Sequence, residues 1–533
     1  MATSGQSEAV RREVGQHFVV GFHGFEVDEN IKTLIAKYLV GNVILMRRNV
    51  QSTKQTQELI RTLQQLAKAA GHERPLLVGI DQENGLVSAF SSPSAGTQFP
   101  GAMALAATDS VDLTERVSAA SARELKMVGI NWVYSPVADV NTDSRNAVIG
   151  VRSFGDDPKK VAEFASGAAR GIVSERVAPT AKHFPGHGDT HVDSHLSLPV
   201  IAKTKAQLAQ EELVPFKALI DAEVPCVMTG HMALPLITGN DTPCSLSKDI
   251  TASLLREELR FSGVVVTDCL EMDAIAEPEQ GGCGVEEGAL RALKARADIA
   301  MICHTFEKQK GAVERVYRAL EQGEVQLEAL KESGVRIAAM KDAFTAGWDE
   351  EATYSDIHAS HLELARNAYS KSTTVVWNAG NVLPLKMLDQ RLLLLTPAME
   401  SVNRAVDSGD GILRGPNGVV RNTAGPSYLA LAKMFEERVK TTHVVYGEND
   451  AVPTLDSVGG VVFVMRNGDL RRWQLEYLEH LSPSVPLVLV SSCGPYDLAD
   501  VRSEYEGWTA YVQTFEFTAA AFEGLVSRIL SDT

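Results

Sequence analysis

A fourteen-residue run, Lys182–His195, concentrates side chains that could do chemistry. It reads Lys-His-Phe-Pro-Gly-His-Gly-Asp-Thr-His-Val-Asp-Ser-His and holds four histidines, two aspartates and a lysine. A packed core does not tolerate so many titratable groups, because each one must be paired or solvated. The run is therefore expected either to face a cleft or to bind a metal.

The metal hypothesis depends on three histidines spaced by four residues: His187, His191 and His195. On a helix they would share one face and could bind zinc. The Pro185–Gly188 turn and the β-branched residues that follow it disfavour a helix, so the spacing loses its geometric meaning. We expect no metal site here, and a metal-dependent barrel hydrolase stays as the alternative.

Acid–base catalysis is the other use of this run. Asp193 and His195 are two residues apart, and side chains at that spacing point the same way in an extended segment. The carboxylate can then accept a hydrogen bond from one ring nitrogen, which leaves the other nitrogen to give or take a proton.

Eight short β-branched runs, each followed by a polar turn and a helical pattern, precede residue 304. Strands that are apolar on both faces and alternate with helices predict a closed parallel TIM-type (β/α)8 barrel. An open doubly wound sheet is the alternative, but eight strands within about 300 residues favour the barrel. The predicted strands are His17–Phe22, Asn42–Met46, Pro75–Ile80, Asn131–Tyr134, Val177–Ala181, Pro225–Thr229, Gly263–Thr267 and Ala297–Cys303.

Charged or polar side chains come directly after several of these strands. Parallel α/β folds build their sites at the carboxyl ends of strands, so these groups are expected to meet at one end of the barrel. They are Asp81, Asp139, Lys182 with His183, His231 and Asp268.

A second strand–helix series predicts another domain, an α/β/α sandwich. The predicted organisation is a barrel over 1–346, a linker over 347–372 and the sandwich over 373–533. The expected sandwich strands are Thr373–Trp377, Arg391–Thr396, Thr442–Tyr446, Gly460–Met465, Pro486–Ser491 and Thr509–Gln513.

Composition excludes several classes of function. The chain has 533 residues and a formal net charge of −17 without a basic block, so neither nucleic acid nor a membrane surface is an expected partner. Six cysteines show no paired spacing, and no signal-like or membrane-spanning apolar run is present. These features predict a cytoplasmic enzyme that needs no cofactor. They leave its oligomeric state open.

The motifs together resemble those of glycoside hydrolase family 3 β-N-acetylglucosaminidases. The diagnostic pattern is Lys-His-Phe-Pro-Gly-His-Gly followed shortly by Asp-Ser-His. The resemblance continues in Gly41–Leu45, Asp81–Glu83, Ser135–Val140, Arg152–Pro158 and Gly263–Met272, and in Leu383–Leu385 and Pro495–Leu498 of the second domain.

This resemblance implies a retaining mechanism that acts on a small carbohydrate. It assigns Asp268 as the nucleophile, His195 as the acid/base and Asp193 as the residue that orients it. It also implies that the sugar is bound by Asp81, Arg152, Lys182 and His183. His231 is a further candidate for the pocket wall.

One departure bears on the substrate. The family usually follows Asp-Gln-Glu with Gly-Gly-Arg-Val-x-Arg, whereas Leu86 and Ala89 stand here in place of the two arginines. Their absence argues against peptidoglycan-derived substrates and favours chito-oligosaccharides or other glycosides that end in N-acetylglucosamine (GlcNAc). Phosphorolysis in place of hydrolysis, and sugar binding without catalysis, are the remaining alternatives.

Overall fold

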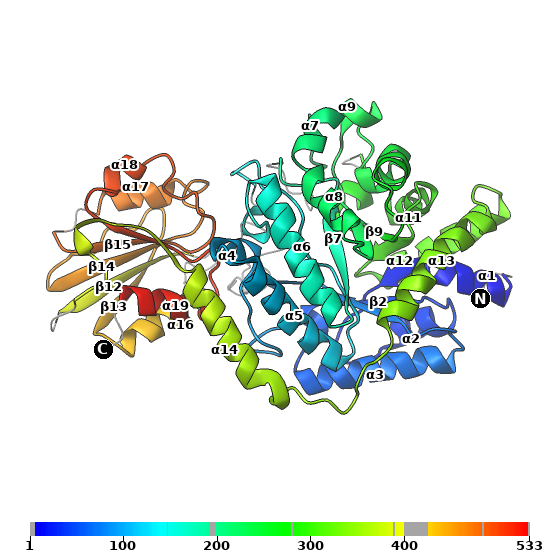
Figure 1. Cartoon of the computed structure of the whole chain (residues 1–533), viewed down its shortest axis with the longest axis horizontal. Coiled ribbons are helices and arrows are strands. Elements are labelled where there is room, and N and C mark those ends of the chain that lie inside the picture. Colours follow the sequence, from blue (N-terminus) through cyan, green and yellow to red (C-terminus); the bar gives the residue numbers. More distant parts are fainter. Residues whose placement is uncertain are drawn as a thin grey trace.

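The chain forms a barrel and a second, sheet-based body, which lie side by side (Figure 1). The computed structural model describes residues 6–146, 148–190, 198–278, 281–386, 390–398, 425–481 and 484–530.

The first body is a closed barrel of eight parallel strands in the order β1-β10-β9-β8-β7-β6-β3-β2. All eight predicted strands are present, so the barrel prediction is confirmed. Their bounds are β1 Phe18–Val20, β2 Asn42–Leu45, β3 Leu77–Ile80, β6 Trp132–Val133, β7 Ala178–Phe184, β8 Cys226–Thr229, β9 Val264–Cys269 and β10 Ile299–Ile302.

Helices surround the barrel, and local sequence signals fix their ends. The Ser52 hydroxyl accepts from the backbone of Gln55 at the start of α3, and Asp157 caps α6 just ahead of a proline. The helices are α1 Glu8–Gly15, α2 Glu29–Ala36, α3 Thr53–Ala69, α4 Ala102–Ala107, α5 Val111–Val128, α6 Pro158–Ser174, α7 Lys205–Gln210, α8 Leu213–Asp221, α9 Pro235–Thr238, α10 Asp273–Ala276, α11 Val285–Lys294, α12 Phe306–Glu321 and α13 Leu327–Phe344, with a π-helix at Asp249–Glu258.

Two local predictions are corrected. Strand β7 runs on to Phe184, so Lys182 and His183 lie inside the strand rather than after it. The periodic apolar pattern of residues 205–222 predicts one helix, but the structure has two, α7 and α8, because Glu211 leaves helical geometry with φ −126° and ψ −87°.

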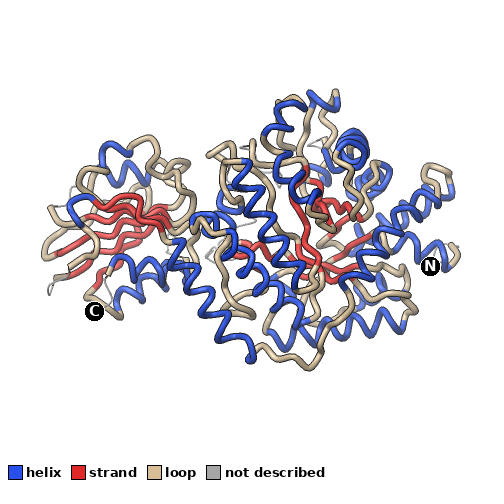
Figure 2. The backbone as a smooth tube through the Cα atoms, in the orientation of Figure 1, coloured by secondary structure: helices blue, strands red, loops and turns tan. Residues whose placement is uncertain are grey.

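The second body is a six-stranded sheet in the order β11-β16-β15-β14-β12-β13, with only β11 antiparallel to its neighbour. Apolar clusters cover both of its faces, so the predicted sandwich is confirmed (Figure 2). Its elements are β11 Thr374–Asn378, β12 Arg391–Pro397, α16 Pro426–Glu436, β13 Thr441–Tyr446, β14 Val458–Met465, α17 Trp473–Glu479, β15 Leu487–Ser491, α18 Arg502–Tyr505, β16 Ala510–Gln513 and α19 Ala519–Ile529.

Helix α14 (Ser355–Ser372), which occupies much of the predicted linker, runs along the junction between the two bodies (Figure 1). Its Tyr369 hydroxyl donates to the buried Glu516 of the sandwich at 2.6 Å, and the backbone N–H of Gly101 in the barrel donates to the same carboxylate at 2.9 Å. Met103 and Ala104 of α4 belong to the apolar cluster of the sandwich. The two bodies therefore share a packed junction.

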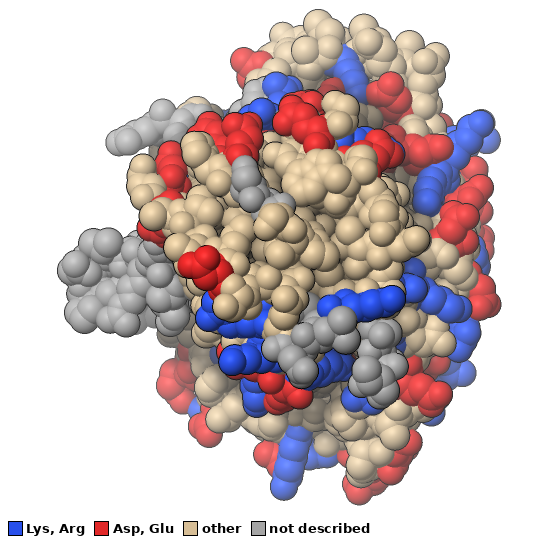
Figure 3. Space-filling model, turned by 90° about the vertical axis from the view of Figure 1, so that its left-hand side faces the viewer, with Lys and Arg blue, Asp and Glu red and all other residues tan. Residues whose placement is uncertain are grey.

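The end of the molecule formed by the sandwich carries a wide area without charge, bordered by side chains of both signs (Figure 3). Among the described residues, no helix is both long enough and apolar enough to cross a membrane.

Candidate functional site

A buried chain of charges lies at the carboxyl ends of β3 and β7. Glu83 is its centre and accepts two hydrogen bonds from Arg152, at 2.8 and 2.7 Å, while its Oε1 lies 2.6 Å from Lys182 Nζ. Burial alone would raise the pKa of Glu83, but the two cations outweigh burial and hold that pKa at about 2. The carboxylate is therefore ionised throughout the neutral range.

Asp81 is the outer end of this chain. Its Oδ1 accepts from Lys182 Nζ at 2.9 Å, and its side chain keeps 34% exposure while that of Lys182 keeps 2%. Burial opposes the charge of Lys182, but Asp81 and Glu83 raise the lysine pKa above its usual value. The site thus offers a fixed ammonium and a solvent-facing carboxylate, which suit hydroxyl groups of a sugar.

His183 is held by the fully buried Asp139. The carboxylate lies 2.7 Å from His183 Nδ1 and also accepts from the backbone N–H groups of His183 and His187, at 3.1 and 2.7 Å. Burial works against ionisation of Asp139, yet His183 and the other donors lower its pKa. Nε2 of His183 lies 3.5 Å from Arg152 Nη2, which joins this pair to the charge chain.

The loop after β7 packs tightly on the barrel. A Cβ on Gly188 would lie only 1.6 Å from the carbonyl oxygen of Val140, so that position requires glycine. His187 is buried, and burial lowers its pKa to about 4, which keeps its ring neutral near pH 7. Its Nδ1 lies 3.0 Å from Thr190 Oγ1. His191 and His195 lie outside the described residues. The hypothesis of a three-histidine metal site therefore stays untested.

Asp268 lies near the carboxyl end of β9 and is partly exposed. Its Oδ1 accepts from the backbone N–H of Cys269 at 2.7 Å. His231, the candidate for the pocket wall, is fully buried: Nε2 lies 2.9 Å from the Cys269 carbonyl oxygen and Nδ1 lies 2.8 Å from Ser245 Oγ. His231 therefore supports the strand end that carries Asp268.

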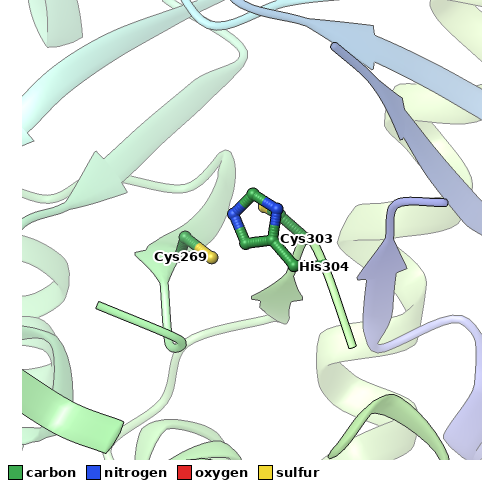
Figure 4. A group of neighbouring side chains, drawn as sticks. All are labelled: Cys269, Cys303 and His304. Carbon is green, nitrogen blue, oxygen red and sulfur yellow. The ribbon is translucent and has the colours of Figure 1, made fainter. Parts of the chain in front are cut away.

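The structure brings four sequence-predicted residues into one network: Asp81, Arg152, Lys182 and His183. Asp268 lies at the same end of the barrel, whereas Asp193 and His195 lie outside the described residues. Sequence reasoning did not single out Glu83, although it is the last residue of the quoted Asp-Gln-Glu motif. The sequence also showed no sign of a cluster of side chains that could hold a metal ion, formed by Cys269, Cys303 and His304 (Figure 4).

The two positions that lack arginine are occupied by apolar contacts. Leu86 packs against the apolar cluster of the sandwich, and Ala89 packs against that of the barrel. The short hairpin β4 (Gln82–Asn84) and β5 (Val87–Ser88) holds both residues near the charge chain. This hairpin therefore places no cation at either position.

Comparisons with known proteins agree with this architecture. Residues 9–340 match the profile described as "Glycosyl hydrolase family 3 N terminal domain". Beta-hexosaminidase A of Pseudoalteromonas piscicida is 33% identical over 69% of this chain and 64% of its own length. Beta-hexosaminidase LpqI of Mycobacterium tuberculosis is 38% identical over 51% of this chain and 70% of its own.

Two solved structures match both bodies. A glycoside hydrolase family 3 beta-N-acetylglucosaminidase from Paenibacillus sp. superposes with a TM-score of 0.85 at 30% identity, covering 97% of this chain and 95% of that one. A fungal multi-domain GH3 beta-N-acetylglucosaminidase gives a TM-score of 0.86 at 34% identity, covering 97% of this chain. This chain spans only 59% of the fungal protein and 64% of the Pseudoalteromonas protein.

Proposed function

The chain belongs to glycosyl hydrolase family 3, and on that premise we propose that it is a retaining exo-β-N-acetylglucosaminidase. It releases GlcNAc from the non-reducing ends of chito-oligosaccharides or related glycosides. The observation that carries the proposal is the partly exposed Asp268 at the same barrel end as the Asp81–Lys182–Glu83–Arg152 charge chain. The names of the matched hexosaminidases and acetylglucosaminidases support it.

In the proposed reaction, Asp268 attacks the anomeric carbon and forms a covalent glycosyl-enzyme while the leaving group departs. Water then attacks that carbon and releases the sugar with its original β configuration. The hydrogen bond from the backbone of Cys269 fixes one carboxylate oxygen of Asp268. That fixed oxygen reduces the reorganisation needed for attack.

The charge chain is the proposed sugar-binding element. The exposed carboxylate of Asp81 accepts hydrogen bonds from hydroxyl groups, and Lys182 and His183 supply donors beside it. Arg152 donates to Glu83 through Nε and Nη2 and to the Val148 carbonyl through Nη1, so it holds the charge chain in place beside His183. Rigid placement of these groups limits the entropy lost when the sugar binds.

His195 is the proposed acid/base, with Asp193 as its partner, on the basis of the Asp-Ser-His motif. His195→Ala is expected to slow hydrolysis of chitobiose on the order of 10²-fold, because its alcohol leaving group needs a proton. A 4-nitrophenyl glycoside should lose much less in its first step, since nitrophenolate leaves unprotonated. Equal losses on both substrates, measured as kcat/KM, would remove His195 from this role.

A substrate panel tests the function itself. We expect 4-nitrophenyl β-GlcNAc and chitobiose to be turned over at least about 10-fold faster than 4-nitrophenyl β-glucoside, because only the first two carry the acetamido group. Proton NMR should show β-GlcNAc as the first product. Parallel reactions with inorganic phosphate separate hydrolysis from phosphorolysis, since GlcNAc-1-phosphate would form only in the latter. No turnover of either GlcNAc substrate would refute the proposal.

A further inference from the structure

Two cysteines and a histidine gather at the carboxyl ends of neighbouring barrel strands. Cys269 ends β9, and Cys303 and His304 follow β10. Their ligand atoms all lie within 4.8 Å of one another, and Figure 4 shows the His304 ring beside both sulfur atoms. The group is therefore already assembled.

The atoms suit a thiophilic divalent cation. Two sulfurs and one imidazole nitrogen are the ligand types of Zn²⁺ and of its analogues Co²⁺ and Cd²⁺, whereas Mg²⁺ and Ca²⁺ prefer oxygen. Zn–S and Zn–N bonds of about 2.3 and 2.1 Å place tetrahedral ligands about 3.5–3.8 Å apart. The ligand atoms, which lie within 4.8 Å of one another, would need to approach each other by only about 1 Å. His304 is exposed, so its ring is free to make this adjustment.

The group lies beside the proposed nucleophile in the fold, because Cys269 is the next residue after Asp268 at the end of β9. The backbone N–H of Cys269 donates to Asp268 Oδ1 at 2.7 Å. Backbone contacts hold the two cysteines in place: the carbonyl of Cys269 binds His231, and that of Cys303 accepts from Arg48 at 2.7 Å. A cation here would add positive charge next to the proposed nucleophile.

We propose that Cys269, Cys303 and His304 form a binding site for a zinc-class cation, and that its occupation inhibits the enzyme. Binding replaces the thiol protons, which pass to solvent, and leaves the fourth position of a tetrahedral ion open. The cation lowers the reactivity of the Asp268 carboxylate by attracting its negative charge. The inhibitory part rests on the proposed function, whereas the binding part does not.

Binding is tested on the full chain after reduction and removal of metal. Titration with Co²⁺ should give one equivalent with thiolate-to-cobalt charge-transfer absorption and the visible bands of tetrahedral cobalt. Zn²⁺ should displace that cobalt. Cys303→Ser and His304→Ala are each expected to weaken binding at least about 10-fold. Cys283→Ser is the matched control, because Cys283 is a free, partly buried cysteine outside the group.

Several outcomes would overturn the site. Unchanged Co²⁺ or Zn²⁺ affinity in Cys303→Ser would place the metal elsewhere, for example on the histidine-rich loop. A cobalt spectrum without thiolate charge transfer would exclude the cysteines as ligands. Loss of two titratable thiols with no metal uptake would indicate a disulfide in place of a metal site.

Inhibition has a separate readout. For each protein, activity on 4-nitrophenyl β-GlcNAc with Zn²⁺ is divided by the activity of the same protein without metal. This ratio should be at least about 10-fold lower for the wild type than for Cys303→Ser. Full activity with one Zn²⁺ bound would refute inhibition but not the site. If the metal-free wild type hydrolyses no GlcNAc glycoside, the proposed function fails, while the cobalt titration still decides the site.

Discussion

Asp268→Ala should reduce kcat on 4-nitrophenyl β-GlcNAc by about 10³-fold or more, with little change in the folded structure. The loss is large because the variant has no group that can form the glycosyl-enzyme, and external water must attack unaided. Asp268 is partly exposed at a strand end, so its removal leaves no buried cavity. Steady-state kinetics and circular dichroism check both parts of the result.

A small nucleophile separates this role from a structural one. Azide can occupy the space left by the carboxylate and attack the same face of the sugar, so azide should restore turnover and yield the α-glycosyl azide. Asp273→Ala, at the start of the nearby α10, is the matched control and should retain activity within about 3-fold. Retained activity in Asp268→Ala, or azide rescue that gives a β product, would contradict the assignment.

Glu83→Gln is expected to lower the free energy of unfolding by about 3–5 kcal/mol, because it leaves two buried cations without their shared carboxylate. Arg152 and Lys182 both contact Glu83, and all three side chains are less than 10% exposed. Urea unfolding followed by fluorescence reports the loss, since Trp132 is buried in the barrel interior. KM should rise as well, because Lys182 also positions Asp81.

The pH dependence of stability identifies the same group. The pKa of Glu83 is about 2 in the folded state and near 4.5 when unfolded, so folding favours the ionised form. This contribution is fully present above pH 4.5 and is lost as the pH falls from 4.5 towards 2. The difference in pKa corresponds to about 3 kcal/mol, and Glu83→Gln should lack this part of the acid destabilisation.

An exposed ion pair provides the control for this prediction. Arg74 and Asp342 also form a close pair, with side chains 38% and 61% exposed. Asp342→Asn should leave the urea midpoint close to that of the wild type, because solvent screens both charges. Equal losses in the two variants would show that burial of the Glu83 cluster contributes nothing.

The barrel could be predicted from the sequence because its strands are apolar on both faces and its helices carry regular caps. Asp157 directly before Pro158, for example, is a local signal that marks the start of α6. Prediction was weaker where tertiary contacts decide the backbone. Strand β7 continues through the charged Lys182 because Asp81 and Glu83 neutralise that side chain, and no local pattern reveals those partners.

The site was predictable to the extent that strand order implies proximity. Asp81, Lys182 and His183 were expected to meet because they end parallel strands, and they do lie in one network. The Cys269–Cys303 pair could not be found in this way. Its members are far apart in sequence and show no motif, and only the register of β9 beside β10 brings them together.

The Glu516 junction bears on the order in which the polypeptide is made. Helix α4 is synthesised early. The Glu516 carboxylate, which accepts a hydrogen bond from the N–H of Gly101 at the start of this helix, is synthesised more than four hundred residues later. Until then Met103 and Ala104 lack the sandwich residues that cover them. A nascent chain with a complete barrel therefore still exposes an apolar patch, and chaperones can bind this patch until the second sheet is made.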